Sequence, residues 1–272
     1  MRYHYMIALA AAILMVSGCE TTTPSAGSSG GTTKPAAASG GASKTDGALG
    51  AITSSFKAMT LSDDDIMAMS DSSCAALDKQ SKIAPPGSKY DSRLKRVVKA
   101  FPASINGKTA QYKVYLTKNV NAWAMANGCI RVYSGLMDLM NDDELRGVIG
   151  HEIGHVALGH SKSRMQMAYA TSAARQAAAA SGNSAVSSLS QSQAGELAEK
   201  FINAQYSQSN ESAADDYSFD LLTERKLQRK GLVTAFQKLA KLGGGGGNSM
   251  LSTHPPSSER AEHMQKRLNA GK

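Results

Sequence analysis

An apolar stretch that carries three ionisable side chains is the feature that most constrains how this chain can fold. His151, Glu152 and His155 stand within a run of aliphatic residues, namely Val148, Ile149, Ile153, Val156 and Leu158. A helix with this pattern is buried, and ionisable side chains inside a core require partners. His151 and His155 lie about 40° apart around such a helix, so both imidazoles point the same way and could bind one tetrahedral metal ion.

Glu152 directly follows the first histidine, where it can reach a water on that ion without being a ligand itself. A metal ion acidifies its bound water toward neutral pH, so this carboxylate could take the proton of the water. Because only three residues are specified, the same pattern also arises by chance on surface helices. The apolar residues around it favour the metal site.

The helix should begin after Asn141, which forms a capping box with Glu144, and should run to about His160. His160 follows His155 by five residues, whereas the third histidine of the metzincin pattern follows by six. On a continuing helix it would point about 140° away from His155. We therefore expect His160 to pack near the site and not to be a ligand.

A third ligand must come from elsewhere, and Glu211 is the candidate. Asp215 follows it by four residues and so lies on the same face of a predicted helix. There it could accept a hydrogen bond from the distal nitrogen of a metal-binding histidine and fix its tautomer. From these residues alone, a solvated acidic face is the favoured interpretation of Glu211 and Asp215.

Three motifs in this order resemble one known family. They are His151-Glu152-x-x-His155, Glu211-x-x-Ala214-Asp215, and Thr253-His254-Pro255-Pro256 followed by Glu259-Arg260. Together they resemble the HtpX, CAAX-prenyl-protease and BepA family of gluzincin zinc metallopeptidases, over roughly Leu49 to Leu268. Within that family, the chain is most similar to lipoprotein peptidases of the outer membrane.

The resemblance implies a role for each site residue. It implies one Zn²⁺ held by His151, His155 and Glu211, with Glu152 as catalytic acid and base and Asp215 as a supporting carboxylate. His254 would approach the zinc, where it either stabilises the oxyanion or occludes the site; a loop histidine that caps the next helix is the alternative.

Two further expectations follow from the same resemblance. The segment Asn121 to Gly128 would lie along the active-site cleft, where an extended peptide can add as a strand. Many relatives have an arginine three residues before the third ligand, whereas this chain has Gln208, so no role is carried over from that arginine.

The N-terminus has the pattern of an exported lipoprotein. Residues 1–18 read as a signal peptide, and Val16-Ser17-Gly18-Cys19 resembles a lipobox, after which Cys19 would carry lipid such as palmitate. An ordinary signal peptide with an incidental cysteine is the alternative. Residues 19–48 contain no aromatic and no large aliphatic residue. This composition predicts a disordered tether before the folded domain at 49–272. Glu20 is not the aspartate typical of inner-membrane retention, so we expect an outer-membrane lipoprotein facing the periplasm.

Export would change the net charge of the chain and would favour disulfide formation between its cysteines. Loss of Arg2 with the signal lowers the net charge from +8 to +7, and the other basic residues are scattered. Export makes nucleic acid an unexpected partner, and the charge predicts a solvated surface with weak attraction to anionic lipid. Cys74 and Cys129 form an even pair once Cys19 is set aside, so we expect a disulfide, with two buried thiols as the alternative.

The periodicity predicts a mainly helical α+β fold with a small edge β-sheet, and the resemblance implies that this fold is a zincin (gluzincin) domain. Strands are expected over 110–116 and 129–133, with a loop or edge segment between them that contains Trp123. The expected helices cover 49–61, 62–81, 92–100, 141–160, an exposed stretch within 168–194, 197–226, 233–241 and 258–268, and residues 243–247 form a glycine loop.

These expectations combine into one function and two alternatives. The chain is expected to be a zinc-dependent endopeptidase that hydrolyses unfolded or misassembled envelope proteins, using a zinc-bound water activated by Glu152. Its partners would be polypeptide substrates, the membrane through the lipid anchor, and envelope assembly or quality-control proteins. The alternatives are an envelope chaperone or assembly factor with a latent zinc site, and a structural lipoprotein whose zinc is closed by His254.

Overall fold

The computed structural model of the protein describes residues 61–172, 189–242, 250–254 and 257–271. Several expectations therefore lie outside the described residues: the signal peptide, Cys19, the tether, the helix over 49–61 and the glycine loop at 243–247. Among the described residues, no helix is both long and apolar enough to cross a membrane.

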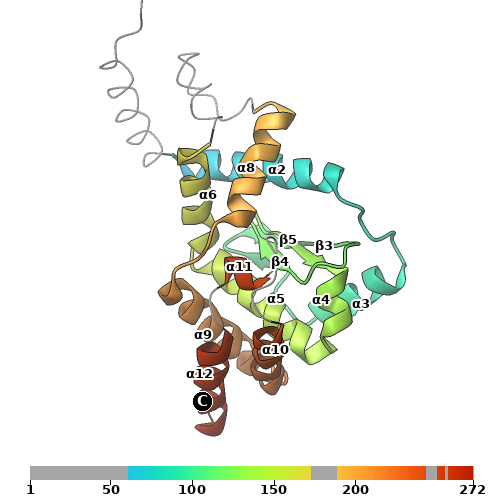
Figure 1. The fold of residues 1–272 in the computed structure, drawn as a ribbon, viewed down its shortest axis with the longest axis vertical. Coiled ribbons are helices and arrows are strands. Elements are labelled where there is room, and N and C mark those ends of the chain that lie inside the picture. Colours follow the sequence, from blue (N-terminus) through green and yellow to red (C-terminus); the bar gives the residue numbers. More distant parts are fainter. Residues whose placement is uncertain (1–60, 173–188, 243–249, 255–256, 272) are drawn as a thin grey trace, which may run out of the picture. The chain divides into compact units, whose positions relative to one another are not determined.

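Helices dominate the described structure, as the sequence predicts (Figure 1), and two small sheets lie among them, one of two strands and one of three. The helices are α2 (Asp63–Gln80), α3 (Lys89–Val98), α4 (Ser134–Leu139), α5 (Asp142–Ala157), α6 (His160–Ala170), α8 (Gln191–Asn203), α9 (Gln208–Glu224), α10 (Lys230–Lys241), α11 (Met250–Thr253) and α12 (Ser257–Asn269). The strands are β1 (Ser104–Ile105), β2 (Lys108–Thr109), β3 (Gln111–Tyr115), β4 (Ala122–Ala124) and β5 (Cys129–Tyr133).

The three-stranded sheet has the order β3-β5-β4, and β4 is an edge strand. β3 runs parallel to β5, with Val114 opposite Val132, while β4 runs antiparallel to it, with Trp123 opposite Arg131. The two strands predicted from alternation are confirmed, and the intervening segment is the edge strand. All five residues of β5 are buried, because helices cover both sides of this short sheet.

Helix α5 begins as predicted but ends earlier. The Asn141 side chain accepts a hydrogen bond from the backbone N–H of Glu144, and the Glu144 carboxylate accepts one from the backbone N–H of Asn141. The expectation that this helix continues to His160 is wrong: it ends at Ala157, and Gly159 adopts a left-handed conformation with φ of 77°. Glycine reaches this conformation without a steric penalty, so it ends α5 and lets His160 begin α6 in a new direction.

The single helix predicted over 197–226 is also wrong. The chain forms α8 and α9, separated by the linker Ala204–Ser207. Ser207 caps α9 by accepting a hydrogen bond from the backbone N–H of Asn210, which is why a new helix begins here. The remaining predicted helices are present, with α3 and α10 each beginning three residues earlier than expected.

The stretch over 168–194, expected to be exposed, is only partly described. Ala168 and Tyr169 at the end of α6, and Ala194 in α8, are all buried, which corrects the expectation at both ends. They are buried because α6 and α8 pack together with α2 in one apolar cluster.

Glycines on one side of α5 allow two helices to approach it closely. A Cβ atom at Gly147 would lie 2.7 Å from the Cα atom of Leu232 in α10, and one at Gly150 would lie 2.6 Å from the Oγ atom of Ser218 in α9. Ser218 also donates a hydrogen bond of 2.9 Å to the carbonyl of Gly147. This close approach brings the side chains of α9 against those of α5.

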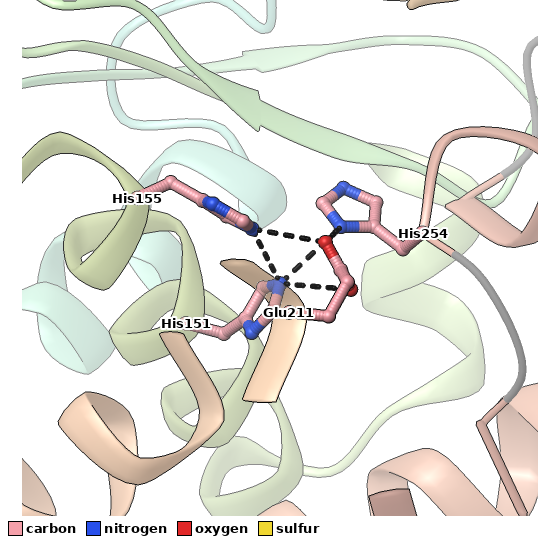
Figure 2. A group of neighbouring side chains, drawn as sticks. All are labelled: His151, His155, Glu211 and His254. Atoms are coloured by element: carbon pink, nitrogen blue, oxygen red, sulfur yellow. Dashed lines mark hydrogen bonds and ion pairs between the residues drawn. The ribbon is translucent and has the colours of Figure 1, made fainter. Parts of the chain in front are cut away.

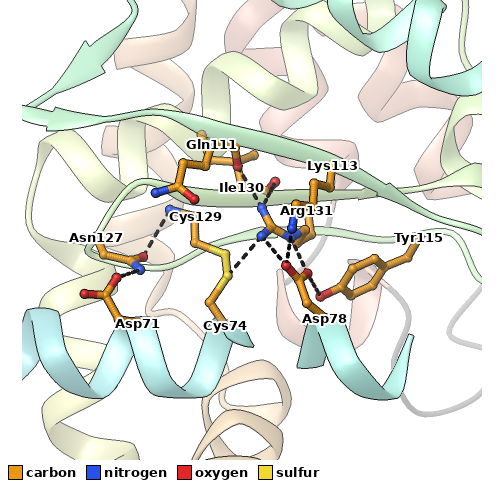
Figure 3. Close-up of a disulfide and its surroundings, with 10 residues drawn as sticks. All are labelled: Asp71, Cys74, Asp78, Gln111, Lys113, Tyr115, Asn127, Cys129, Ile130 and Arg131. Carbon is orange, nitrogen blue, oxygen red and sulfur yellow. Dashed lines mark hydrogen bonds and ion pairs between the residues drawn. A yellow bond between two sulfur atoms is a disulfide. The ribbon is translucent and has the colours of Figure 1, made fainter. Parts of the chain in front are cut away.

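A disulfide between Cys74 and Cys129 joins α2 to β5, the pairing expected from the sequence (Figure 3). Beside it the buried Arg131 guanidinium makes two hydrogen bonds to Asp78, of 2.8 and 2.9 Å. Burial raises the pKa of Asp78, but hydrogen bonds from Arg131, Lys113 and Tyr115 outweigh this effect and hold it at about 2. The α2 helix is thus fixed to the sheet by a covalent bond and by a paired buried charge.

The glycine contacts of α5 yield a testable prediction. Gly147→Ala should lower the free energy of unfolding by about 1 kcal/mol, because overpacking costs typically 1–3 kcal/mol and exceeds the gain in helix propensity. Gly195→Ala in α8 is the matched control, since its Cβ would meet only the flexible end of Gln80 at 3.1 Å. We expect the control to be neutral or slightly stabilised. Urea denaturation measures both, and equal midpoints for Gly147→Ala and the parent would contradict the packing account.

Candidate metal centre

Three helical segments bring four potential metal-binding side chains to one point (Figure 2). His151 and His155 project from α5, Glu211 from the first turn of α9, and His254 directly follows α11. Each of the four side chains is at most 2% exposed. Their nearest donor atoms all lie within 4.8 Å of one another.

Four of the separations between these donor atoms are close to those around a tetrahedral zinc ion. His151 Nε2 lies 3.0 Å from His155 Nε2 and 3.3 Å from His254 Nδ1. Glu211 Oε1 lies 3.2 Å from His155 Nε2 and 2.9 Å from His254 Nδ1. With zinc–ligand bonds of about 2.0–2.1 Å, the edge of a tetrahedron is about 3.3 Å. Imidazole nitrogens and one carboxylate are also the ligand types that zinc prefers.

Asp215 orients the first histidine. Its Oδ1 atom lies 2.7 Å from His151 Nδ1, so a proton on Nδ1 can be donated to the carboxylate. That tautomer leaves the lone pair of Nε2 directed toward His155 and Glu211, as a metal ligand requires. The structure therefore places Asp215 where the sequence predicts a supporting carboxylate.

Arg260 from α12 binds both carboxylates of α9. Its Nε and Nη2 atoms donate to Asp215 at 2.7 and 2.6 Å, and its Nη1 atom lies 2.6 Å from Glu211 Oε2. Arg260 belongs to the third sequence motif, but no role was predicted for it. Its role could have been predicted from charge, because two carboxylates buried in a core require a buried cation as a partner.

The second histidine is held by contacts on two sides. His155 Nδ1 lies 3.1 Å from His160 Nδ1, and the His155 ring stacks on Tyr206 with centroids 3.7 Å apart and planes at 12°. His160 thus packs on the site and stands outside the donor group, although it does so from α6 and not from a continued α5. Burial and the nearby His151 hold the pKa of His155 well below its ordinary value, so its ring is neutral.

Glu152 is buried beside the donor group without a hydrogen bond to its Oε1 atom from any residue that the structure describes. His254 Nε2 lies 3.6 Å from that atom. Burial raises the pKa of Glu152 above its ordinary value. For Glu211 burial acts in the same direction, but the attraction of His254 and His151 outweighs it and lowers the pKa.

Charge balance gives a further test of fit. The carboxylates of Glu152, Glu211 and Asp215 are each at most 1% exposed, whereas Arg260 is the single cation that bonds this group among the described residues. With neutral histidines, the group carries an excess of two negative charges. Uncompensated charges in a core are strongly unfavourable, and a divalent cation at the donor group removes the excess.

Comparisons with known proteins agree with this geometry. A model of peptidase family M48 matches residues 88–268. The chain is 48% identical to the metalloprotease YcaL of Escherichia coli (strain K12) over 267 residues, which cover 98% of each chain. It is 52% identical to the metalloprotease LoiP of the same organism over 226 residues, 83% of this chain and 89% of the relative. A short stretch of 37 residues, 14% of this chain and 12% of the relative, is 54% identical to the protease HtpX of Acinetobacter baumannii (strain AYE).

Proposed function

Because the chain belongs to peptidase family M48 and is a zinc metalloendopeptidase, we propose that it cleaves unfolded or misassembled proteins of the bacterial envelope. The observation that carries the catalytic part is the buried group of His151, His155 and Glu211 with Glu152 beside it, whose Oε1 atom accepts no hydrogen bond from the described residues. The envelope part rests on the signal and lipobox pattern of residues 1–19.

His151, His155 and Glu211 would hold the zinc, through the two Nε2 atoms and the carboxylate of Glu211. When bound there, zinc supplies a Lewis acid that polarises the scissile carbonyl and acidifies water. Asp215 keeps His151 in the tautomer that leaves Nε2 free, and Arg260 holds both carboxylates of α9 in place.

Glu152 would move the proton. Its Oε1 atom is buried, accepts no hydrogen bond from the described residues and stands beside the donor group, so it can accept a proton from the attacking water. The burial that raises its pKa also helps it to keep that proton until the leaving amine takes it. Transfer from water to amine through one carboxylate balances the hydrolysis.

The substrate backbone would pair with the edge strand β4, in the segment Asn121 to Gly128. β4 has a sheet partner on one side only, and it packs against α5, the helix of His151. Edge strands accept extended peptides through main-chain hydrogen bonds, with little dependence on peptide sequence. Such recognition suits a peptidase that acts on unfolded chains.

The N-terminal pattern gives the location. Cys19 would carry the lipid, residues 19–48 would separate the domain from the membrane, and the domain at 49–272 would face the periplasm from the outer membrane. Its partners there would be polypeptide substrates and envelope assembly or quality-control proteins, without nucleic acid.

One observation favours a latent site as the second candidate. His254 places Nδ1 at 2.9 Å from Glu211 Oε1 and 3.3 Å from His151 Nε2, which is the position of a fourth ligand. A closed zinc site has no open position for water. In addition, the backbone N–H of Met250 in α11 donates to the carbonyl of Val120 beside β4. The arrangement suits a resting enzyme, or a chaperone or assembly factor whose peptidase is silent.

Separate replacement of Glu152 and Glu211 distinguishes the residue that transfers the proton from the residue that binds the metal. Glu152→Gln keeps the size of the side chain but cannot accept a proton, so zinc should stay at one ion per chain while casein hydrolysis falls at least about 100-fold. Glu211→Gln replaces an anionic ligand by a weaker neutral one. Zinc should therefore be lost or bound far less tightly, and the Tm should fall. Metal content and casein digestion, with and without a chelator, measure both effects.

Asp215→Asn completes this series, with zinc affinity lowered by about 10–100-fold. Zinc content equal to the parent in Glu211→Gln would show that the third ligand is assigned wrongly. A parental rate in Glu152→Gln would reject the proposed proton transfer.

His254→Ala tests the second candidate. If His254 closes the site, its removal opens a position for water, and casein hydrolysis should rise while zinc remains at one ion per chain. A fall in hydrolysis with zinc retained would instead give His254 a catalytic role, as a donor to the oxyanion.

The lipid anchor is tested through Cys19. Cys19→Ala should leave a folded and active domain that is released from membranes, since one residue alone would carry the acyl chains. Fractionation in high salt measures the release. A Cys19→Ala protein that still sediments with outer membranes must be anchored by another part of the chain.

A further inference from the structure

The linker Ala204–Ser207 between α8 and α9 contacts three parts of the metal centre. The Tyr206 ring stacks on His155 with centroids 3.7 Å apart. The backbone N–H of Tyr206 donates to the carbonyl of Thr253, the residue before His254, at 3.2 Å. Ser207 caps α9 four residues before Glu211. One short segment thus touches or adjoins His155, Glu211 and His254.

Tyr206 is held by a cation on its other face. The guanidinium carbon of Arg164 lies over the Tyr206 ring, 4.2 Å from its centroid. Because His155 is stacked on one face, Arg164 must lie on the opposite one. The same guanidinium carbon lies 4.9 Å from the centroid of the Phe201 ring, so Arg164 contacts two buried aromatic rings. Stacking of this kind fixes the plane of each ring as well as its position.

Arg164 also anchors the backbone that leads into the linker. Its Nη2 atom donates a hydrogen bond of 2.9 Å to the carbonyl of Ile202 and another to the carbonyl of Ala204. These carbonyls belong to the C-terminal end of α8, where a cation is favourable. Arg164 lies on α6, so α6 holds the linker in place together with the Tyr206 ring.

The Nδ1 atoms of His151 and His155 have partners of different strength, so these contacts alone fix the His151 ring more firmly than the His155 ring. His151 has a buried carboxylate at 2.7 Å from Nδ1, whereas His155 has only the half-buried His160 at 3.1 Å. A single hydrogen bond sets the direction of one atom but permits the ring to rotate about that bond. The parallel contact with Tyr206, at 12°, removes this freedom.

We infer that Tyr206, clamped between His155 and Arg164, is a positioning residue that sets the plane of the His155 ring and hence the geometry of the metal centre. This inference rests on the proposed metal ligands. The role belongs to the aromatic face of Tyr206. The hydroxyl makes contacts of its own, with Ser161 Oγ at 3.5 Å and with the Arg164 side chain.

The test uses Co²⁺ in place of zinc, because the visible absorption of Co²⁺ reports the geometry of its ligands. Tyr206→Leu removes the flat face, so we expect a changed Co²⁺ spectrum, zinc affinity lowered by about 10–100-fold and a fall in kcat with little change in KM. Tyr206→Phe keeps the face and should restore the parental spectrum and kcat. Arg164→Lys, which keeps a charge but loses the planar fork, should change the spectrum in the same direction.

Tyr169→Leu is the matched control, since Tyr169 is a buried tyrosine of α6 outside the metal centre. It should lower the Tm but leave the Co²⁺ spectrum and zinc affinity unchanged. A parental spectrum in both Tyr206→Leu and Arg164→Lys would overturn the inference. If Tyr206→Leu does not fold, the spectrum of Arg164→Lys decides alone.

Two other results have distinct meanings. A loss of kcat in Tyr206→Phe with a parental spectrum would make the hydroxyl catalytic and overturn the positioning role. A parent protein that binds Co²⁺ but does not digest casein would favour the latent site over the active peptidase, and the Co²⁺ spectra would still test the positioning role. A parent that gives no Co²⁺ spectrum would refute the ligand set and the inference together.

Discussion

The structure depends on the burial of a negatively charged group in the middle of a helical core. Glu152, Glu211 and Asp215 are each almost completely removed from solvent, and Arg260 is the cation that bonds the group among the described residues. Such a group is stable only if its charge is compensated and its polar atoms are bonded. A divalent metal at the donor group meets both requirements, so metal binding and folding should be strongly coupled in this protein.

The surrounding helices are built to bring these charges together. Gly147 and Gly150 allow α10 and α9 to approach α5 so closely that methyl groups at these positions would overlap with neighbouring atoms. Glu211 and Asp215 consequently reach the histidines of α5, although about 60 residues separate them along the chain. On the other side, α6 and the linker before α9 hold His155.

The sequence predicted those parts that depend on local pattern. Asn141 and Glu144 predict the start of α5 through a capping box, alternation predicts β3, and β5 was a second strand candidate. Motif spacing predicted that His151 and His155 share one face of a helix, whereas the resemblance to a known family implied that Glu211 and His254 lie near the same metal ion. The pairing of Cys74 with Cys129 followed from their even number.

Tertiary contacts decided the features that the sequence did not reveal. The end of α5 depends on one left-handed glycine, Gly159, within residues that otherwise favour helix. The linker before α9 was assigned to a helix because nothing local shows that Tyr206 packs on His155. Arg260 lies 45 residues after Asp215, and no periodicity links them. These contacts bring together segments that are distant in sequence, where propensity carries no information.

The most direct test of the account is a crystal structure of the zinc-loaded protein with anomalous diffraction collected at the zinc edge. The account predicts one strong anomalous peak within about 2.2 Å of His151 Nε2, His155 Nε2 and an oxygen of Glu211. His254 Nδ1 would stand at the fourth position in the resting state. A zinc ion bound stoichiometrically at any other place, or one that leaves Glu211 outside its ligands, would contradict the central claim.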